Sequence, residues 1–258
     1  MKAVILAGGL PSTITEENEG IPKPMVEIGE KPIIWHIMKN LSHYGVNDFI
    51  VCSGYKSDMI KNYFNDYYIY HSDITVNLKN NTIKIHKNIT EDWHVTVADT
   101  GLKSSTNERI RKVKPYIGDE SFILTYGDCL SNIDINIMTE IHRKNGLIAT
   151  MAIARPTGRN QTLNIDKEGR LCKDYLQQNE TSAWANTGTY IFTNGIFNYL
   201  EENDSIERQP IQNLVKDLQV MTYKHDEFWR PVETKRDKEE VIQLWNEGLA
   251  PWKVWQEY

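Results

Sequence analysis

The sequence has few cysteines, no excess of basic residues and no long apolar run. Its three cysteines, Cys52, Cys129 and Cys172, lie far apart and form neither a Cys-x-x-Cys pair nor a cluster with histidines. This excludes a disulfide framework and a zinc site of the usual spacing, and we expect reduced, mostly buried thiols. The formal net charge is −6, so we expect neither nucleic acid nor a membrane surface as a partner.

The apolar segments are short throughout the chain. The first one, Ala3 to Ala7, ends at Gly8-Gly9, and no stretch approaches the length that spans a bilayer. We therefore expect a cytoplasmic protein. Of the 258 residues, 40% are hydrophobic and 25% are charged, which is an ordinary globular composition and allows a large core.

The order of the apolar patterns predicts an α/β fold. Ala3 to Ala7 and Asp48 to Ser53 are typical of buried strands, and helical patterns follow them at Pro32 to Tyr44 and Ser57 to Tyr67. Strand, helix, strand, helix implies a parallel sheet with right-handed crossovers. Further strands are expected at Ile74–Leu78, Ile83–Lys87, Val95–Ala98, Phe122–Tyr126, Ile148–Ala154, Leu163–Ile165, Thr187–Phe192 and Val220–Tyr223. Further helices are expected at Glu108–Val113, Ile135–Lys144, Ile196–Leu200, Pro210–Leu218 and Lys235–Asn246.

Two segments near the N-terminus suit phosphate binding. Gly8-Gly9 directly follows a buried strand, where backbone N–H groups can face an anion, although an ordinary tight turn has the same sequence. Lys23 stands between Pro22 and Pro24, which stiffen the backbone and fix the direction of the ammonium group. Without its context, Lys23 would be an exposed lysine in a turn.

Two carboxylates are candidates for metal binding. Asp128 follows the strand Phe122 to Tyr126, at the edge where α/β sheets bind ligands. Its oxygens could hold Mg²⁺ between phosphates, or it could be a solvated residue of a turn. Glu233 could be a second metal ligand, or only an acid close to a helix N-terminus. The tryptophans of the C-terminal part are most simply packing and interface residues: Trp229, Trp252 and Trp255.

Together these segments resemble the sugar-1-phosphate nucleotidyltransferases, and among them the glucose-1-phosphate cytidylyltransferase family. The likeness extends in register over essentially the whole chain. It is carried by Gly8-Gly9, Lys23-Pro24-Met25-Val26-Glu27-Ile28-Gly29, Lys31-Pro32-Ile33-Ile34-Trp35-His36-Ile37-Met38, Tyr126-Gly127-Asp128 and Ala250-Pro251-Trp252-Lys253-Val254-Trp255.

The resemblance implies a Rossmann-like α/β fold, with a mixed, mainly parallel sheet flanked by helices and a smaller substrate-facing lobe. The chain would form a single domain over residues 1–258, in which residues 1–130 bind the nucleotide and residues 131–258 bind the sugar. The implied reaction joins CTP and a sugar 1-phosphate to give a CDP-sugar and pyrophosphate, with Mg²⁺ as cofactor. The family also implies a homo-oligomer.

Roles for individual residues follow from the same resemblance. The nucleotide would be held by Leu6, Ala7, Gly8, Gly9, Lys23 and Arg109. Asn186 would contact the sugar, and Asp128 and Glu233 would bind Mg²⁺. Lys23 and Asp128 would be the catalytic residues, since the sugar phosphate attacks the α-phosphorus of CTP in line and positive charge stabilises the transition state.

Departures from the family pattern fall on phosphate-binding positions. Pro11-Ser12-Thr13-Ile14 stands where the family has Gly-Thr-Arg-Leu, so Pro11 lacks an N–H group and Thr13 replaces an arginine. Gln178 stands at the lysine of the family's Glu-Lys-Pro, Glu233 at an aspartate and Cys129 at a glycine.

Two interpretations therefore remain open. The first is an active nucleotidyltransferase with an altered phosphate site, in which Arg155, Arg159, Lys56 or a lysine of a neighbouring subunit supplies the missing positive charge. The second is a catalytically impaired homologue that binds a nucleotide, a nucleotide-sugar or a partner protein without turnover.

Overall fold

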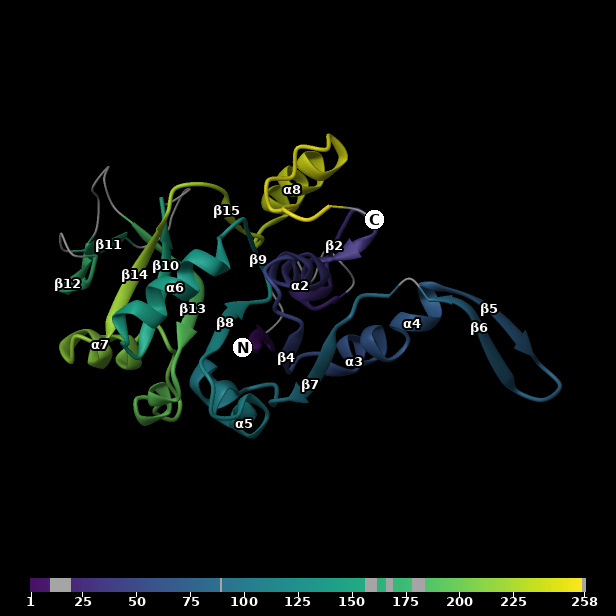
Figure 1. Cartoon of the computed structure of the whole chain (residues 1–258), viewed down its shortest axis with the longest axis horizontal. Helices are drawn as coiled ribbons and strands as arrows, with labels where there is room; N and C mark the ends of the chain where they lie inside the picture. The colour runs from purple at the N-terminus through teal and green to yellow at the C-terminus, as the bar shows by residue number, and fades with distance from the viewer. Residues whose placement is uncertain (10–19, 89, 156–161, 166–168, 178–183, 257–258) are drawn as a thin grey trace.

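The computed structural model describes residues 1–9, 20–88, 90–155, 162–165, 169–177 and 184–256 (Figure 1). Pro11, Thr13, Arg159 and Gln178 lie outside the described residues. Within the described segments, none of the helices has both the length and the apolar character that crossing a bilayer requires.

A seven-stranded sheet forms the centre of the molecule. Its strands are β1 (Ala3–Ala7), β4 (Asp48–Ser53), β7 (His94–Asp99), β8 (Phe122–Tyr126), β10 (Ala149–Ala154), β13 (Ala185–Phe192) and β14 (Val220–His225). They lie in the order β14-β10-β13-β8-β1-β4-β7. All neighbouring pairs are parallel except those of β13, which runs antiparallel to β8 and β10. The expectation of a mixed, mainly parallel sheet is confirmed.

Helices cover both faces of this sheet (Figure 1). They are α2 (Ile33–His43), α3 (Ser57–Asn65), α4 (Tyr67–Tyr70), α5 (Thr106–Ile117), α6 (Ile135–Asn145), α7 (Gln209–Lys216) and α8 (Lys235–Asn246), with 3-10 segments η1 (Lys23–Met25) and η2 (Asn194–Asn198). Helices α2 and α6 pack into one buried cluster, whereas α5 and α7 pack into another. Strand β1 is apolar along its whole length because its alternate side chains enter both clusters.

In the part of the chain that the structure describes, four two-stranded sheets complete the fold. They pair β2 (Glu27–Ile28) with β3 (Lys31–Pro32), β5 (Ser72–Asn77) with β6 (Thr82–Asn88), β9 (Cys129–Ser131) with β15 (Trp229–Pro231), and β11 (Thr162–Ile165) with β12 (Leu171–Gln177). The β5–β6 hairpin projects from the body, at the right of Figure 1. Five of these strands were not predicted from the sequence. Four of them, β2, β3, β9 and β15, are only two or three residues long, which is too short to show a pattern, whereas β12 has seven residues.

Two of the expected helices are wrong in detail. The helix expected at Ile196 to Leu200 is the 3-10 segment η2, in which Ile196 N bonds to Thr193 O and Tyr199 N to Ile196 O. Hydrogen bonds between residues three positions apart define a 3-10 helix, whereas an α-helix has bonds between residues four positions apart. The single helix expected from Ser57 to Tyr67 is divided at Asp66 into α3 and α4.

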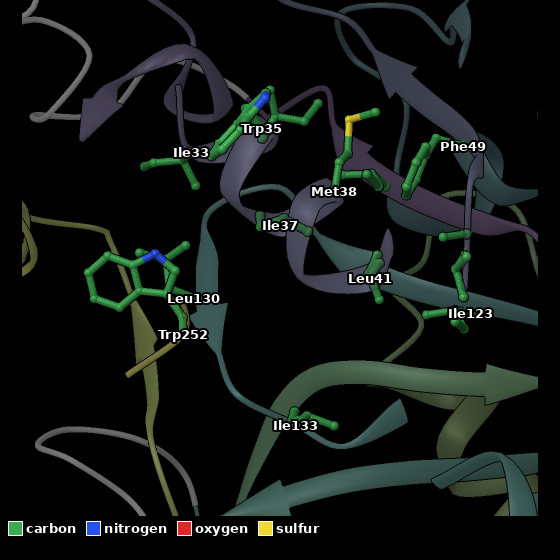
Figure 2. Close-up of a cluster of buried hydrophobic side chains, with 14 of the residues drawn as sticks. Ile33, Trp35, Ile37, Met38, Leu41, Phe49, Ile123, Leu130, Ile133 and Trp252 are labelled. Atoms are coloured by element: carbon green, nitrogen blue, oxygen red, sulfur yellow. The ribbon is translucent and has the colours of Figure 1, made fainter. Parts of the chain in front are cut away.

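The C-terminal segment is anchored on α2 by an aromatic layer made of Trp35, His36, Trp245, Trp252 and Trp255. Trp252 is fully buried, and its ring lies 6.2 Å from His36 and 6.3 Å from Trp245. Figure 2 shows Trp252 beside Leu130, near the α2 side chains Ile33 and Ile37. The expectation that the C-terminal tryptophans are packing residues agrees with this burial.

His36 is the polar centre of the aromatic layer. Its Nε2–H donates to Ile28 O at 2.9 Å, and Trp252 Nε1–H points to its Nδ1 at 3.4 Å. Burial lowers the pKa of His36 from 6.5 to about 4. The imidazole is therefore neutral at pH 7, which leaves Nδ1 able to accept the Trp252 hydrogen bond.

The two described cysteine thiols, those of Cys52 and Cys129, are both free. Cys52 is buried, as expected, and burial raises its pKa to about 12. Cys129 is only partly buried. The side chain of Cys172 lies outside the described residues.

Candidate active site

A cavity of about 630 Å³ opens at the carboxyl ends of β1, β4, β7 and β8. This is the edge at which open α/β sheets bind their ligands. The lining residues include Leu6, Ala7, Gly8, Gly9, Lys23, Tyr55, Lys103, Arg109, Tyr126, Asp128, Cys129, Asn186, Gly188, Glu207, Trp229 and Glu233.

The glycine loop after β1 is packed against Arg109. A Cβ atom at Gly8 would collide with the guanidinium group of Arg109, whereas a Cβ at Gly9 would meet open space. Gly8 is therefore required for close packing, and Gly9 leaves the backbone accessible from the cavity.

Arg109 is largely committed to the protein itself. Its Nη1 donates to Ser53 O at 3.3 Å and Thr100 Oγ1 at 2.7 Å, and its Nη2 donates to Leu102 O at 3.3 Å. Burial lowers the pKa of Arg109. The Arg109 side chain lines the cavity. Its hydrogen bonds hold the backbone that follows β4 and β7, so its clearest role in the structure is to position these two segments.

Lys23 and Asp128 form an ion pair in the cavity. Lys23 Nζ lies 3.2 Å from Asp128 Oδ2, and both side chains are about three-quarters buried. The lysine is presented by η1, which begins directly after Pro22 and contains Pro24. The rigid, flanking prolines thus direct the ammonium group to the end of β8, about as the sequence suggested.

Glu233 is brought to Asp128 by the β9–β15 pair. Pro231 pairs with Cys129, and Val232 N donates to Asp128 O at 2.8 Å. Burial raises the pKa of the Cys129 thiol, and the nearby charges of Asp128 and Glu233 raise it further. Both carboxylates line the cavity and offer hard oxygen ligands.

Asn186 and Trp229 border another part of the cavity. The amide of Asn186 donates from Nδ2 to the Tyr190 hydroxyl and accepts at Oδ1 from Gly188 N at 2.9 Å. Trp229 Nε1 donates to Thr187 O at 3.0 Å. This wall of the cavity is held by hydrogen bonds on β13 and β15.

The residues expected at the site thus come together. All of those selected from the sequence line the one cavity: Leu6, Ala7, Gly8, Gly9, Lys23, Arg109, Asp128, Asn186 and Glu233. Among the described residues, no group of three or more His, Cys, Asp or Glu could hold a metal ion. A metal here would depend on the two carboxylates together with oxygens of a ligand.

Sequence reasoning assigned no role to several side chains of the cavity wall, among them Tyr55, Lys103, Tyr126 and Glu207. It proposed Arg155 and Lys56 as replacement cations, but neither is among the described residues that line the cavity. Arg155 pairs with Asp226 and lies over the Trp184 ring. Lys103 had a signal, since it follows Gly101 at the end of a predicted strand and precedes the helix that carries Arg109.

The chain belongs to the nucleotidyl transferase family, whose model matches residues 2–238. It is 39% identical over 258 residues to the glucose-1-phosphate cytidylyltransferase of Salmonella typhimurium, covering 99% of this chain and 100% of that protein. It is 38% identical over 257 residues to the probable glucose-1-phosphate cytidylyltransferase of Bacillus subtilis, with 99% and 100% covered.

Solved structures of more distant proteins share the fold. One is UDP-glucose pyrophosphorylase complexed with UDP-glucose, with a TM-score of 0.73, 17% identity, and 96% of this chain and 98% of that chain covered. Another is the inositol-1-phosphate CTP transferase from T. maritima, with a TM-score of 0.71, 14% identity, and 100% and 98% covered. At these identities the likeness concerns the fold alone.

Proposed function

We propose that this chain is a sugar-1-phosphate cytidylyltransferase, which joins CTP and a sugar 1-phosphate to give a CDP-sugar and pyrophosphate. One observation carries the proposal. The glycine loop, the Lys23–Asp128 pair and Glu233 line a single cavity of about 630 Å³, which is within the usual size of small-molecule sites. The full-length similarity to glucose-1-phosphate cytidylyltransferases supports cytosine as the base and glucose 1-phosphate as the first acceptor to test.

The reaction needs positioning and positive charge, and no protein nucleophile. An oxygen of the sugar phosphate bonds to the α-phosphorus of CTP, and the bond from that phosphorus to the pyrophosphate oxygen breaks. Lys23 would place its ammonium group against the phosphates, and the accessible backbone at Gly9 would lie along the nucleotide. Charge placed in advance in this way stabilises the transition state without reorganisation.

Asp128 and Glu233 would hold Mg²⁺, which they fit because they offer carboxylate oxygens on adjacent backbone segments. The ion would neutralise charge on the phosphate oxygens. Asp128 bonds Lys23 at 3.2 Å, so its carboxylate is already placed to bind a cation. Residues 1–130 would bind the nucleotide, while residues 131–258 would bind the sugar, with Asn186 as a sugar contact.

A homo-oligomer is supported by the projecting hairpin. Ile74, Val76, Leu78, Ile83 and Ile85 on the β5–β6 hairpin are between 37% and 89% exposed. A two-stranded hairpin with exposed apolar side chains gains little stability alone, so a second copy of this chain would cover it. Sedimentation should show a particle larger than a monomer, and Val76→Lys with Ile83→Lys should reduce its size. The cytoplasmic location stays a prediction.

A catalytically impaired homologue is the second candidate, and one specific observation favours it. Thr13 and Gln178 lack the charges that the family resemblance expects at those positions. Loss of a comparable phosphate-binding group costs roughly 10²–10³ in rate.

Pyrophosphate release separates the two candidates. The protein is incubated with Mg²⁺, each nucleoside triphosphate and a panel of sugar 1-phosphates, with Asp128→Asn as the inactive control. Release that depends on both CTP and a sugar 1-phosphate supports the enzyme. Absence of release with every pair would refute it, and activity that appears only after Pro11→Gly, Thr13→Arg and Gln178→Lys are combined would identify an impaired homologue.

A further inference from the structure

A third carboxylate, that of Glu207, lines the cavity and has no part in the chemistry above. It belongs to the loop that leads into α7 and is partly buried. The other two carboxylates on the described cavity wall, Asp128 and Glu233, are assigned to the metal. The Glu207 carboxylate is therefore available to bind a ligand group other than a metal ion.

The loop that carries Glu207 is fixed to the N-terminus of α5. Asn107 is fully buried, and its Nδ2 donates to Glu201 O at 3.0 Å while its backbone N donates to Asp204 O at 3.3 Å. Asp204 Oδ2 in turn accepts from Gln209 N at 3.1 Å. These bonds, made on both sides of Glu207, hold its backbone in place beside the cavity.

Two hydroxyl groups orient the carboxylate itself. The Tyr126 hydroxyl donates to Glu207 Oε1, and the Ser205 hydroxyl donates to Glu207 Oε2. Burial, and next the charge of Glu207, raise the pKa of Tyr126, so the phenol keeps the proton that it donates. Each carboxylate oxygen thus receives one internal hydrogen bond.

The Tyr126 ring is fixed by the opposite strand. Gly188 has a φ of +78°, and a Cβ atom there would lie 2.6 Å from Tyr126 Cδ2. Only glycine lets the ring lie this close to β13. Tyr126 therefore links Glu207 to the Asn186–Gly188 wall, and it also lies two residues before Asp128.

We propose that Glu207 accepts hydrogen bonds from two neighbouring hydroxyl groups of the bound substrate, with Tyr126 as its positioning residue. A carboxylate has about four acceptor positions. Tyr126 and Ser205 occupy one on each oxygen, which leaves one on each oxygen for a ligand. Two acceptors on one rigid group match a vicinal diol, and a negative charge at this place repels phosphate.

This inference rests on the proposed function, because both substrates of that reaction carry such diols. The ribose of CTP offers its 2′- and 3′-hydroxyl groups, and the hexose offers its ring hydroxyl groups. The shared chemistry is the diol, and the two sources are separated by binding measurements that need no turnover.

Calorimetry in the presence of Mg²⁺ tests the assignment with Glu207→Ala, Glu207→Gln and Tyr126→Phe. Glu202→Ala is the matched control, since Glu202 lies on the same loop, is 71% exposed and pairs with Arg111. The ligands are CTP, 2′-deoxy-CTP, 3′-deoxy-CTP and CDP-glucose. Hydrogen bonds to a charged group are strong enough that Glu207→Ala should weaken the recognised ligand roughly tenfold or more. Glu207→Gln and Tyr126→Phe should give smaller losses.

If the ribose is the source, Glu207→Ala weakens CTP, and its effect shrinks for the deoxy analogues. If the hexose is the source, CTP is unaffected and CDP-glucose alone is weakened. Equal losses for CTP and both deoxy analogues, or affinities for CTP and CDP-glucose both within about twofold of wild type, would overturn the assignment. A wild-type protein that binds neither CTP nor CDP-glucose would instead refute the proposed function, and this inference with it.

Discussion

The cavity and the aromatic layer share one short stretch of chain but are built differently. Between Tyr126 and Ser131, Asp128 lines the cavity, whereas Leu130 is buried beside Trp252 (Figure 2). Asn40 reinforces the second region by donating to both Ser131 O and Trp252 O at 3.1 Å. The charged groups of the cavity wall are held by hydrogen bonds and ion pairs, such as those of Arg109 and Lys23, whereas the layer consists of large rings that are buried or partly buried.

This difference separates two kinds of residue. A partly buried cavity side chain such as Asp128 can be changed with little loss of packing, but its charge is needed by the ligand. A side chain of the layer touches no ligand, and its removal leaves a void. Substitutions in the cavity should therefore change turnover or affinity, and substitutions in the layer should change the free energy of unfolding.

The largest effect is expected from Trp252→Ala. Removal of a fully buried tryptophan should lower the free energy of unfolding by about 3–5 kcal/mol. Urea unfolding measures this loss, and Trp252→Phe should recover part of it. The turnover number per folded molecule should stay near that of wild type. A stable Trp252→Ala protein without activity would contradict the separation of the two regions.

Asp128→Asn should have the opposite effect, with a large loss of turnover and a small loss of stability. It removes the charge that pairs with Lys23 and that would hold the metal, so kcat should fall roughly 10²–10³-fold. The free energy of unfolding should fall by only about 1–2 kcal/mol, because asparagine keeps the size and a hydrogen-bonding oxygen of the side chain. Pyrophosphate release and urea unfolding measure the two quantities, with the exposed Asp119→Asn as control. A large loss of stability would show that Asp128 is a structural residue.

The contribution of His36 to the stability of the aromatic layer can be tested through the pH dependence of the free energy of unfolding. The folded-state pKa of His36, about 4, is below its ordinary value of 6.5. Its contribution is therefore fully present above pH 6.5 and is lost as the pH falls toward 4, because only the unfolded state binds the proton in that window. The difference is worth about 3 kcal/mol.

Urea unfolding at pH 7, 5.5 and 4.5 follows this loss. His36→Gln should make the pH profile flatter over the window, and His43→Gln, at an exposed position of α2, should leave it unchanged. An identical profile for wild type and His36→Gln would remove His36 as its cause.

The smallest effect is expected from Lys103→Ala. Lys103 is an exposed cation on the cavity wall, in a protein that lacks an arginine at position 13. Its loss should raise KM for CTP about threefold at low salt, with a smaller effect at high salt because exposed charges are screened. Lys61→Ala, an exposed lysine of α3 outside the cavity lining, is the control. Equal KM values for both variants would show that Lys103 does not contact the phosphates.

The sequence predicted those parts of the site that are encoded locally. Gly8-Gly9, Lys23 and Asp128 each follow a strand or stand between prolines, so their position could be inferred from a few neighbouring residues. The apolar runs likewise predicted the parallel strands, because both faces of the sheet are buried.

The rest depends on contacts between distant segments. The Tyr126–Glu207 bond joins residues 81 positions apart, and no local pattern marks Glu207 as a cavity residue. Glu233 reaches Asp128 through the pairing of β9 with β15, strands of three residues each, which are too short to show alternation. Their register pairs Trp229 with Ser131 and Pro231 with Cys129, which lie far apart in the sequence, so it appears only in three dimensions.

The proposed transfer is tested most directly by its stoichiometry, measured by ³¹P NMR with CTP, glucose 1-phosphate, Mg²⁺ and the wild-type protein. CTP and glucose 1-phosphate should disappear together, while CDP-glucose and pyrophosphate appear in equal amounts. Unchanged CTP, or CTP cleaved to CMP and pyrophosphate with glucose 1-phosphate left intact, would contradict the proposed transfer.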